Sequence, residues 1–278
     1  MPVMETVLTP EQKAHFDQYG YLVLRGFFSP AEVAEIRESF MDAAKDGPVP
    51  GLSDGIPMQG GKANPSDPLT FYPRMMHPHR HHDMQVGRIA QKYMLDPRLE
   101  PVLAALMGEE PVAAQSMFYF KPPKARGQEL HQDNFYLRVK PGTCYAAWVA
   151  VDDVDAENGG MKVVPGSHRE EIACPEQADL SVSFTRDFVR VPKGMEAVHC
   201  DMKAGDVLFF NGSLIHGSTP NTSETRFRRS LIFHYVPRSS EELSAGYVQP
   251  MRFSGDVVSI APATGGGPCG VAEALPLH

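Results

Sequence analysis

The stretch VAAQSMFYFKPPKARG, residues 112–127, marks a change in the pattern of the sequence, because an apolar run of β character ends there in a turn rich in proline, lysine and glycine. Further short apolar runs, each followed by turn residues, are FYLRV (135–139), CYAAWVAV (144–151), DVLFF (206–210) and SLIFHYV (230–236). Several short strands at this spacing are typical of a β-sandwich or barrel. From about residue 111 onward we therefore expect a mainly β core.

Upstream of this core the signals are helical. Thr9 and Ser29 each stand directly before a proline, which is the pattern of an N-cap followed by the first helical position. Glu32 completes a capping box with Ser29. Gly20 should end the first helix, and YLVLRGFF (21–28) reads as a short strand between the two helices.

A long irregular segment follows the second helix. Residues 45–81 are rich in glycine and proline and show no periodic pattern. A structureless stretch of this length is uncommon in a compact domain and is usually functional or disordered. Two more helices are predicted after it, at about 82–94 and 97–107, and Gly108 should end the second.

Composition limits the class of protein. The chain has 278 residues, 42% of them hydrophobic and 22% charged, with a net charge of −8. An acidic chain without a long basic run argues against a nucleic-acid partner. The longest apolar run, 144–151, is too short to cross a bilayer, and the amino terminus has no signal-peptide pattern. We therefore expect a cytoplasmic protein without a membrane or nucleic-acid partner.

The cysteines carry no metal or redox motif. They lie at positions 144, 174, 200 and 269, and none belongs to a C-x-x-C pair. We expect four reduced thiols.

The segment LHQDNFYL (130–137) places a histidine and an aspartate two residues apart in a predicted strand. Side chains alternate along a strand, so His131 and Asp133 should project to the same side. An imidazole nitrogen and a carboxylate oxygen on one face suit a metal ion, but a third ligand is needed. His216, at a strand end before a Gly-Ser-Thr-Pro turn, is the strongest downstream candidate.

Two histidines and one carboxylate leave three coordination positions of a metal open, as in non-haem Fe(II) oxygenases. The segment TRFRRSLIFHY (225–235) follows His216. If a strand begins near 228, Arg228 and Ser230 share one face and Arg229 takes the other. An inward arginine near a metal is costly unless it meets an anion, and a dicarboxylate reaching from the metal would satisfy it.

Taken in this order and with these flanks, the motifs resemble the phytanoyl-CoA dioxygenase (PhyH-like) family of Fe(II)/2-oxoglutarate-dependent oxygenases. The similarity runs from GYLVLRGFFSPAEV (20–33) to LIFHYVP (231–237). It implies that Arg228 binds the far carboxylate of 2-oxoglutarate, although a longer spacing after the distal histidine than in some members leaves Arg226 as an alternative. The iron ligands it implies are His131, Asp133 and His216.

The resemblance also implies a fold. The expected architecture is mainly β with peripheral α-helices, a double-stranded β-helix (jelly roll, cupin-like). Residues 1–278 would form a single domain, with N-terminal helices and a substrate loop in 1–110, the jelly-roll core in 111–240 and a C-terminal extension in 241–278.

Three further residues match weaker features of the family. Met117, in the strand before the H-x-D, and Trp148 would lie beside 2-oxoglutarate, and Ser218 would donate a hydroxyl to it. Ordinary core packing explains Met117 and Trp148 almost as well.

The segment RMMHPHRHHD (74–83) is locally basic in an acidic chain. We expect it to form part of a lid over the iron and to meet an anionic or strongly polar substrate through Arg74, His77, His79 and Arg80. A second metal site there is disfavoured, because Pro78 and the mixed spacing offer no single preorganised face.

Three residues complete the candidate substrate contacts. Gln132 and Asn134 face away from the ligands on a regular strand, but they would reach substrate if the segment bends. His234 shares a face with Arg228, so it lines the pocket or belongs to the core.

The predicted activity is hydroxylation of a C–H bond of a small, polar or anionic metabolite. The cofactor is Fe(II), the co-substrates are 2-oxoglutarate and O2, and succinate and CO2 are released. One alternative is a cupin-like metal-dependent oxygenase or isomerase that does not use 2-oxoglutarate. Another is a non-catalytic metal- or ligand-binding jelly-roll protein. The expected partner is a small-molecule substrate, and a homo-oligomer stays open.

Overall fold

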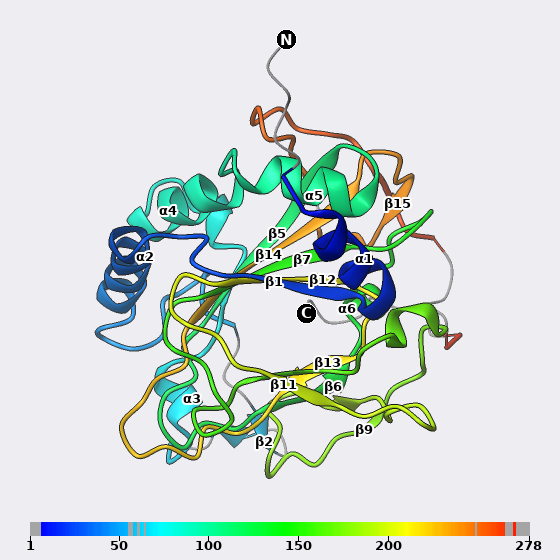
Figure 1. Cartoon of the computed structure of the whole chain (residues 1–278). Helices are drawn as coiled ribbons and strands as arrows, with labels where there is room; N and C mark the ends of the chain where they lie inside the picture. Colours follow the sequence, from blue (N-terminus) through cyan, green and yellow to red (C-terminus); the bar gives the residue numbers. More distant parts are fainter. Residues whose placement is uncertain are drawn as a thin grey trace.

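A computed structural model describes residues 7–54, 58–59, 62–63, 65–247, 249–264 and 269–270 of the chain. Two antiparallel sheets face one another, as Figure 1 shows. The larger sheet contains, in spatial order, β1 (Tyr21–Leu24), β12 (Val207–Asn211), β7 (Tyr145–Ala150), β14 (Ser230–Pro237), β5 (Pro111–Tyr119) and β4 (Met75–Met76). The smaller contains β11 (Val198–Cys200), β8 (Met161–Val163), β13 (His216–Ser218) and β6 (Gln128–His131).

Three two-stranded ladders lie outside these sheets. They pair β2 (Met58–Gln59) with β3 (Lys62–Ala63), β9 (Glu176–Gln177) with β10 (Asp187–Phe188), and β15 (Glu242–Leu243) with β16 (Ala261–Pro262).

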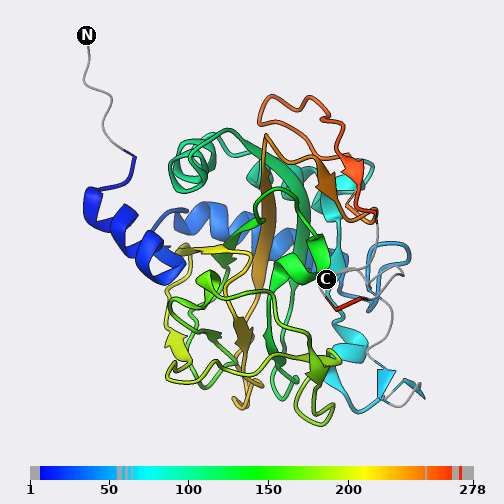
Figure 2. The same cartoon turned by 90° about the vertical axis from the view of Figure 1, so that its right-hand side faces the viewer.

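The strand β14 explains why the central runs of the sequence are apolar on both sides. It lies between β7 and β5 in the larger sheet, and Figure 2 shows it as the long orange strand. Phe233 and Tyr235 pack into the cluster under the helices, whereas Ile232 packs into the cluster between the two sheets. Both faces are therefore buried, and a continuous apolar run results.

The pairing of β14 with β5 contains one irregularity. His234 is opposite Gln115, but Tyr235 is opposite Ala113, so Ala114 has no partner residue in the ladder. This is a β-bulge, with one extra residue on β5.

Helices cover the outer face of the larger sheet, where α4 and α5 lie on the side away from the smaller sheet (Figure 1). Their bounds are α1 (Pro10–Tyr19), α2 (Pro30–Ala43), α4 (Gln85–Met94) and α5 (Leu99–Met107). The short helix α3 (Pro68–Phe71) lies apart from them, on the side of the smaller sheet (Figure 1). Phe40 of α2 stacks on Phe118 of β5 at 4.0 Å between ring centroids. An aromatic pair of this kind contributes about 0.5–1.5 kcal/mol beyond its buried area.

The predicted helix ends are confirmed. Thr9 and Ser29 each form a full capping box, with Gln12 and Glu32 as the third residues of their helices. Gly20 ends α1 at a φ of 81°, which only glycine adopts without strain.

The irregular stretch 45–81 contains more structure than its composition predicts. Its described parts hold β2, β3, α3, β4 and the 3-10 helix η1 (Pro78–Arg80). Some of its residues, 55–57, 60–61 and 64, lie outside the described part of the chain.

Two predictions are wrong. FYLRV (135–139) is not a strand, because residues Asp133–Leu137 form the short helix α6, which Arg138 ends in the left-handed region at a φ of 54°. The cysteines are not all reduced, because Cys174 and Cys269 form a disulfide while Cys144 and Cys200 are free. A separation of 95 residues gave no local signal for this pair.

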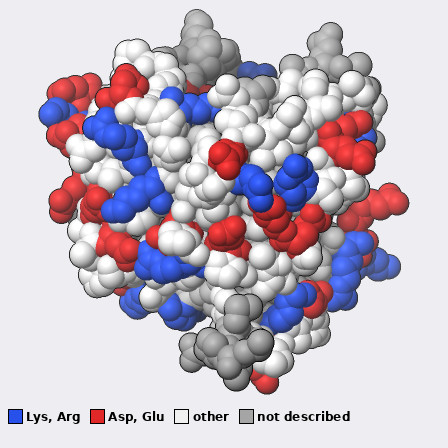
Figure 3. Space-filling view, turned by 90° about the horizontal axis from the view of Figure 1, so that it is seen from above, with Lys and Arg blue, Asp and Glu red and all other residues white. Residues whose placement is uncertain are grey.

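Among the described residues, no helix is both long enough and apolar enough to cross a membrane. On the face shown in Figure 3, acidic and basic side chains lie side by side. Surface pairs such as Lys92–Glu35 and Arg98–Glu32 are part of this mixed surface charge. The remaining short helix is η2 (Ser167–Arg169).

Candidate metal centre and its pocket

Strand pairing brings the three predicted metal ligands together. His131 ends β6 and His216 begins β13, and the two residues are opposite one another in the smaller sheet. The Nε2 atom of each histidine lies 3.5 Å from Oδ1 of Asp133. Ligand atoms at about 2.0–2.2 Å from a metal and near right angles to each other are about 3 Å apart, so the three residues fit one ion. We call these three residues the metal end.

The backbone explains why Asp133 joins the histidines. Gln132 is extended, with φ −126° and ψ 122°, so the alternation of side chains continues until α6 begins at Asp133. Gln132 points away and is buried. Its amide donates to the carbonyl of Ser213 at 2.8 Å and accepts from the backbone N–H of Ala173 at 2.8 Å.

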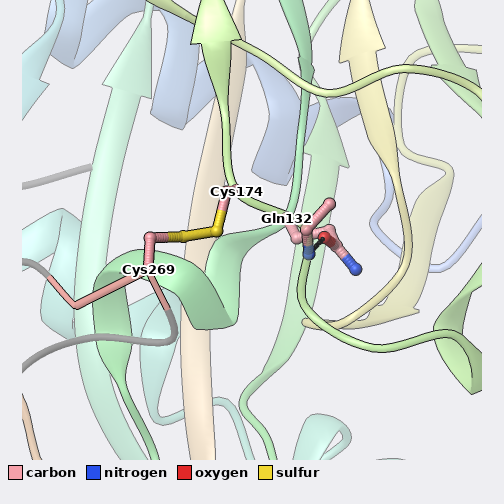
Figure 4. The surroundings of a disulfide bond; sticks show 4 residues. Gln132, Cys174 and Cys269 are labelled. Atoms are coloured by element: carbon pink, nitrogen blue, oxygen red, sulfur yellow. Dashed lines mark hydrogen bonds between the residues drawn. A yellow bond between two sulfur atoms is a disulfide. The ribbon is translucent and has the colours of Figure 1, made fainter.

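Gln132 also adjoins the disulfide. Ala173 precedes Cys174, and Figure 4 shows the Cys174–Cys269 bond beside Gln132. Gln132 was predicted to contact the substrate if its segment bends. In the structure its side chain instead bonds to the backbone of the segments that surround the metal end.

Each ligand histidine is oriented by its own strand. The Nδ1 atom of His131 lies 2.7 Å from the carbonyl oxygen of Glu129, and that of His216 lies 3.0 Å from the carbonyl oxygen of Leu214. A proton on Nδ1 donates to each carbonyl and leaves Nε2 as the unprotonated nitrogen that can bind a metal. Burial lowers the pKa of His216 to about 4, so its imidazole is in the neutral form that binds metals.

His234 stands behind the carboxylate. Its Nε2 atom lies 2.9 Å from Oδ2 of Asp133, and both side chains are 1% exposed. A ring N–H that donates to Oδ2 leaves Oδ1 facing the two ligand histidines. Hydrogen bonds of this type orient metal ligands and are a second layer of most metal sites.

The metal end is one side of a buried pocket between the sheets. Its other lining residues are mainly apolar or aromatic, namely Met117, Tyr119, Gln128, Trp148, Met161, Phe210, Gly217, Ser218, Arg228, Ile232 and His234. The predicted co-substrate residues are therefore all in the pocket wall. The Nε2 atom of the Gln128 amide lies 3.3 Å from Nε2 of His131.

Arg228 lies in the same pocket and is 2% exposed. Its Nε donates to the carbonyl of Gly159 at 3.1 Å, one terminal nitrogen donates to Ser230 Oγ at 3.0 Å, and its guanidinium lies 5.3 Å from the centre of the Trp148 ring. Burial lowers the pKa of Arg228 to about 10, so it remains charged at neutral pH. We call Arg228, Ser218 and Ser230 the arginine end.

The neighbouring arginines are occupied elsewhere. Arg226 is partly exposed and pairs with Asp155 at 2.7 Å and Glu157 at 2.9 Å. Arg229 pairs with Asp152 at 2.7 Å. Of the three, Arg228 is the one that borders the pocket.

The predicted lid residues lie around the pocket rather than in it. Arg74 pairs with Asp54 at 2.7 Å and donates to the hydroxyl of Tyr119 at 3.0 Å, so it reaches the pocket wall through Tyr119. His79 is buried, with Nδ1 2.6 Å from Ser116 Oγ.

Burial keeps two of the lid histidines neutral, because it lowers the pKa of His77 and of His79 to about 3. Burial also lowers the pKa of the partly exposed Arg80. The side-chain carbonyl of Asn134 accepts from the backbone N–H of Val139 at 3.0 Å, just after α6 ends.

Sequence reasoning missed several pocket residues. Tyr119 could have been predicted, because Tyr119 lies two positions after Met117 on the same strand and therefore shares its face. Gln128 and Phe210 carried no signal that separates them from ordinary strand residues. Lys121, which contacts Ser218, was passed over as part of a turn.

A buried site of two histidines and one carboxylate, with an apolar pocket beside it, defines the class of non-haem iron oxygenases. The family model "Phytanoyl-CoA dioxygenase (PhyH)" matches residues 16–230, so the chain belongs to the phytanoyl-CoA dioxygenase family. The resemblance inferred from the motifs is thereby confirmed.

Curated relatives agree in sequence. The chain is 26% identical over 268 residues to the peroxisomal phytanoyl-CoA dioxygenase of Bos taurus, which covers 91% of this chain and 76% of the relative. It is also 26% identical over 264 residues to phytanoyl-CoA dioxygenase 1 of Oryza sativa subsp. japonica, with 85% of this chain and 92% of the relative covered.

Solved structures agree in fold. EctD from S. alaskensis with 2-oxoglutarate and 5-hydroxyectoine has a TM-score of 0.69 at 22% identity, over 95% of this chain and 88% of that one. The epimerase SnoN in complex with Fe3+, alpha ketoglutarate and nogalamycin RO has a TM-score of 0.66 at 20% identity, over 92% and 95%.

Proposed function

We propose that the protein is an Fe(II)- and 2-oxoglutarate-dependent hydroxylase that acts on a small, polar or anionic metabolite, built on a double-stranded β-helix. The observation that carries the proposal is the pairing of the metal end with Arg228 in one buried pocket. The family supports it, and so do structural relatives that were solved with iron or 2-oxoglutarate bound.

The residues of the chain have separate tasks in this proposal. His131, Asp133 and His216 hold Fe(II), and His234 holds the carboxylate in place. A bound ferrous ion supplies oxygen activation coupled to the conversion of 2-oxoglutarate to succinate and CO2.

Arg228 binds the distal carboxylate of 2-oxoglutarate through its remaining N–H donors. Trp148 and Phe210, with the other apolar lining residues, exclude water from the reacting groups. The substrate would approach past Tyr119, whose hydroxyl accepts a hydrogen bond from Arg74. A polar or anionic substrate is supported by this arginine, although Asp54 already offsets much of its charge.

A cytoplasmic location is weakened by the disulfide, because stable disulfides are rare in the cytosol. The partner proposed is the small-molecule substrate.

Anaerobic titration of the Fe(II) protein with 2-oxoglutarate tests the co-substrate assignment. Chelation should give a visible metal-to-ligand charge-transfer band. Arg228→Leu should weaken 2-oxoglutarate binding by about 100-fold, because two charge-assisted hydrogen bonds are lost. Arg226→Leu is the matched control and should bind normally. If no band appears in the wild-type protein, a metal enzyme without 2-oxoglutarate becomes the better assignment.

A panel of candidate substrates tests the reaction. Stimulated succinate release identifies a substrate, and mass spectrometry of the product separates the outcomes. Hydroxylation adds one oxygen atom, whereas an epimerase leaves the mass unchanged and a cyclase removes two hydrogens. The latter two outcomes are included because the structural relatives SnoN and SnoK are an epimerase and a carbocyclase.

A further inference from the structure

Lys121 is buried beside the arginine end and is 2% exposed. Its ammonium donates to Ser218 Oγ at 2.7 Å and to the carbonyls of Thr219 at 2.6 Å and Gly159 at 3.2 Å. An ammonium group has three N–H donors and no acceptor. All three donors are therefore used, and Lys121 contacts a bound molecule through Ser218 rather than directly.

The backbone of Lys121 has an unusual conformation that several hydrogen bonds hold in place. Its φ is 36°, in the left-handed region that non-glycine residues avoid. Its carbonyl accepts from the backbone N–H of Arg228 and from the side-chain amide of Asn221, both at 3.1 Å. A Cβ at Gly159 would lie 2.7 Å from Cδ of Lys121 and 2.8 Å from the carbonyl oxygen of Thr219, and the φ of 82° also favours glycine there.

Two buried cations lie close together as a result. Lys121 and Arg228 donate to the same carbonyl, that of Gly159. In the part of the chain that the structure describes, neither forms an ion pair with a carboxylate. Burial and the charge of Arg228 lower the pKa of Lys121. Like charges in a dry site repel, and an anion held between them offsets the repulsion.

We propose that Lys121 is a positioning residue for the distal carboxylate of 2-oxoglutarate, acting through Ser218. Since Ser218 Oγ accepts from the lysine, its own O–H is directed into the pocket as a donor to the carboxylate that Arg228 binds. This inference rests on the proposed function, because it takes the anion to be that of 2-oxoglutarate.

The test measures binding to the anaerobic Fe(II) protein by the charge-transfer band. The ligands are 2-oxoglutarate and pyruvate, which has the same chelating end but no distal carboxylate. Lys121→Met should weaken 2-oxoglutarate by about 10- to 100-fold, the effect of losing a hydrogen-bond arrangement to a charged group. Its affinity for pyruvate and for Fe(II) should not change.

A double-mutant cycle identifies the route of the effect. Because Lys121 acts through Ser218, the Lys121→Met/Ser218→Ala protein should bind 2-oxoglutarate no more weakly than Ser218→Ala alone. Lys124→Met is the control, since Lys124 is an exposed lysine nearby that pairs with Glu224. Should Lys121→Met fail to fold, Lys121→Leu, which also removes the donor to Ser218, takes its place.

The possible failures are distinct. Equal weakening of both ligands, or unchanged 2-oxoglutarate affinity in the lysine variants, overturns the role of Lys121 while the wild-type band stands. Absence of the band in the wild-type protein overturns the proposed function itself.

Discussion

The two ends of the pocket are positioned by different means. At the metal end, each histidine is fixed by the carbonyl two residues before it on its own strand, and strand pairing then brings His131 and His216 together. At the arginine end, contacts join Lys121, Gly159 and Arg228, which come from separate turns. The comparison shows that strand geometry and strand pairing set the metal end, whereas side-chain contacts between separate irregular segments set the arginine end.

The largest effect should follow from removal of the one charged ligand at the metal end. Asp133→Ala should lower the affinity for Fe(II), or for Mn(II) as an air-stable substitute, by at least about 1000-fold. The reason is that loss of an outer-layer partner alone costs about 10–100-fold. Isothermal titration calorimetry measures the affinity, with exposed Asp46→Ala as the control. Tight metal binding by the Asp133 variant would show that the ligand set is misassigned.

The disulfide should affect the metal end through its scaffold. Cys174→Ser/Cys269→Ser should lower the free energy of unfolding by about 2–4 kcal/mol, because the unfolded chain loses a cross-link between residues 95 apart. Urea unfolding measures this. Metal affinity should fall as well, since the segment before Cys174 bonds to Gln132, while the contacts of the arginine end remain.

Reduction of the wild-type protein is the control for the disulfide. A phosphine reductant should reproduce the loss of stability in the wild-type protein and have no effect on the double variant. If the wild-type protein shows two further free thiols without reductant, the bond does not form in solution.

A smaller effect is expected behind the metal. His234→Phe should weaken Fe(II) binding by about 10–100-fold, because the carboxylate of Asp133 loses the partner that orients it. The affinity of the metal-loaded variant for 2-oxoglutarate should change far less. His199→Asn, at an exposed position on β11, is the control. Equal losses in both affinities would mean that the two ends are not independent.

The smallest effect at neutral pH concerns His79, which belongs to neither end and acts only in acid. Burial lowers its pKa to about 3 from the ordinary 6.5, so the unfolded chain takes up a proton below pH 6.5 that the folded protein does not. Its contribution is therefore intact above pH 6.5 and is lost as the pH falls toward 3, by at most about 1.4 kcal/mol per pH unit. His79→Gln should flatten the stability profile in this window, measured by urea unfolding. An unchanged slope would show that His79 titrates normally.

Sequence patterns predicted the parts of the molecule that depend on local chemistry. The capped helices α1 and α2 follow from a cap residue before a proline, and the β core follows from short apolar runs. The metal end was predictable because alternation along an extended backbone places His131 and Asp133 on one face.

The rest depends on contacts that no local pattern encodes. FYLRV has the composition of a strand, but its apolar side chains are buried equally well on a single helical turn. The pairing of Cys174 with Cys269 and the placement of Lys121 both depend on segments about a hundred residues apart in sequence meeting in space. Gln128, in the pocket wall, was missed for a similar reason.

The bulge in β5 has a consequence for insertions and deletions. Successive strand residues face opposite sides of a sheet. Removing one residue between the bulge and the end of β5 would therefore shift the register and turn Met117, Tyr119 or both away from the pocket. Removing Ala114 would instead close the bulge and leave Gln115 opposite His234, with Ala113 still opposite Tyr235. The Ala113–Ala114 pair is thus a place in this ladder at which the chain can shorten by a residue without reversing the faces on either side.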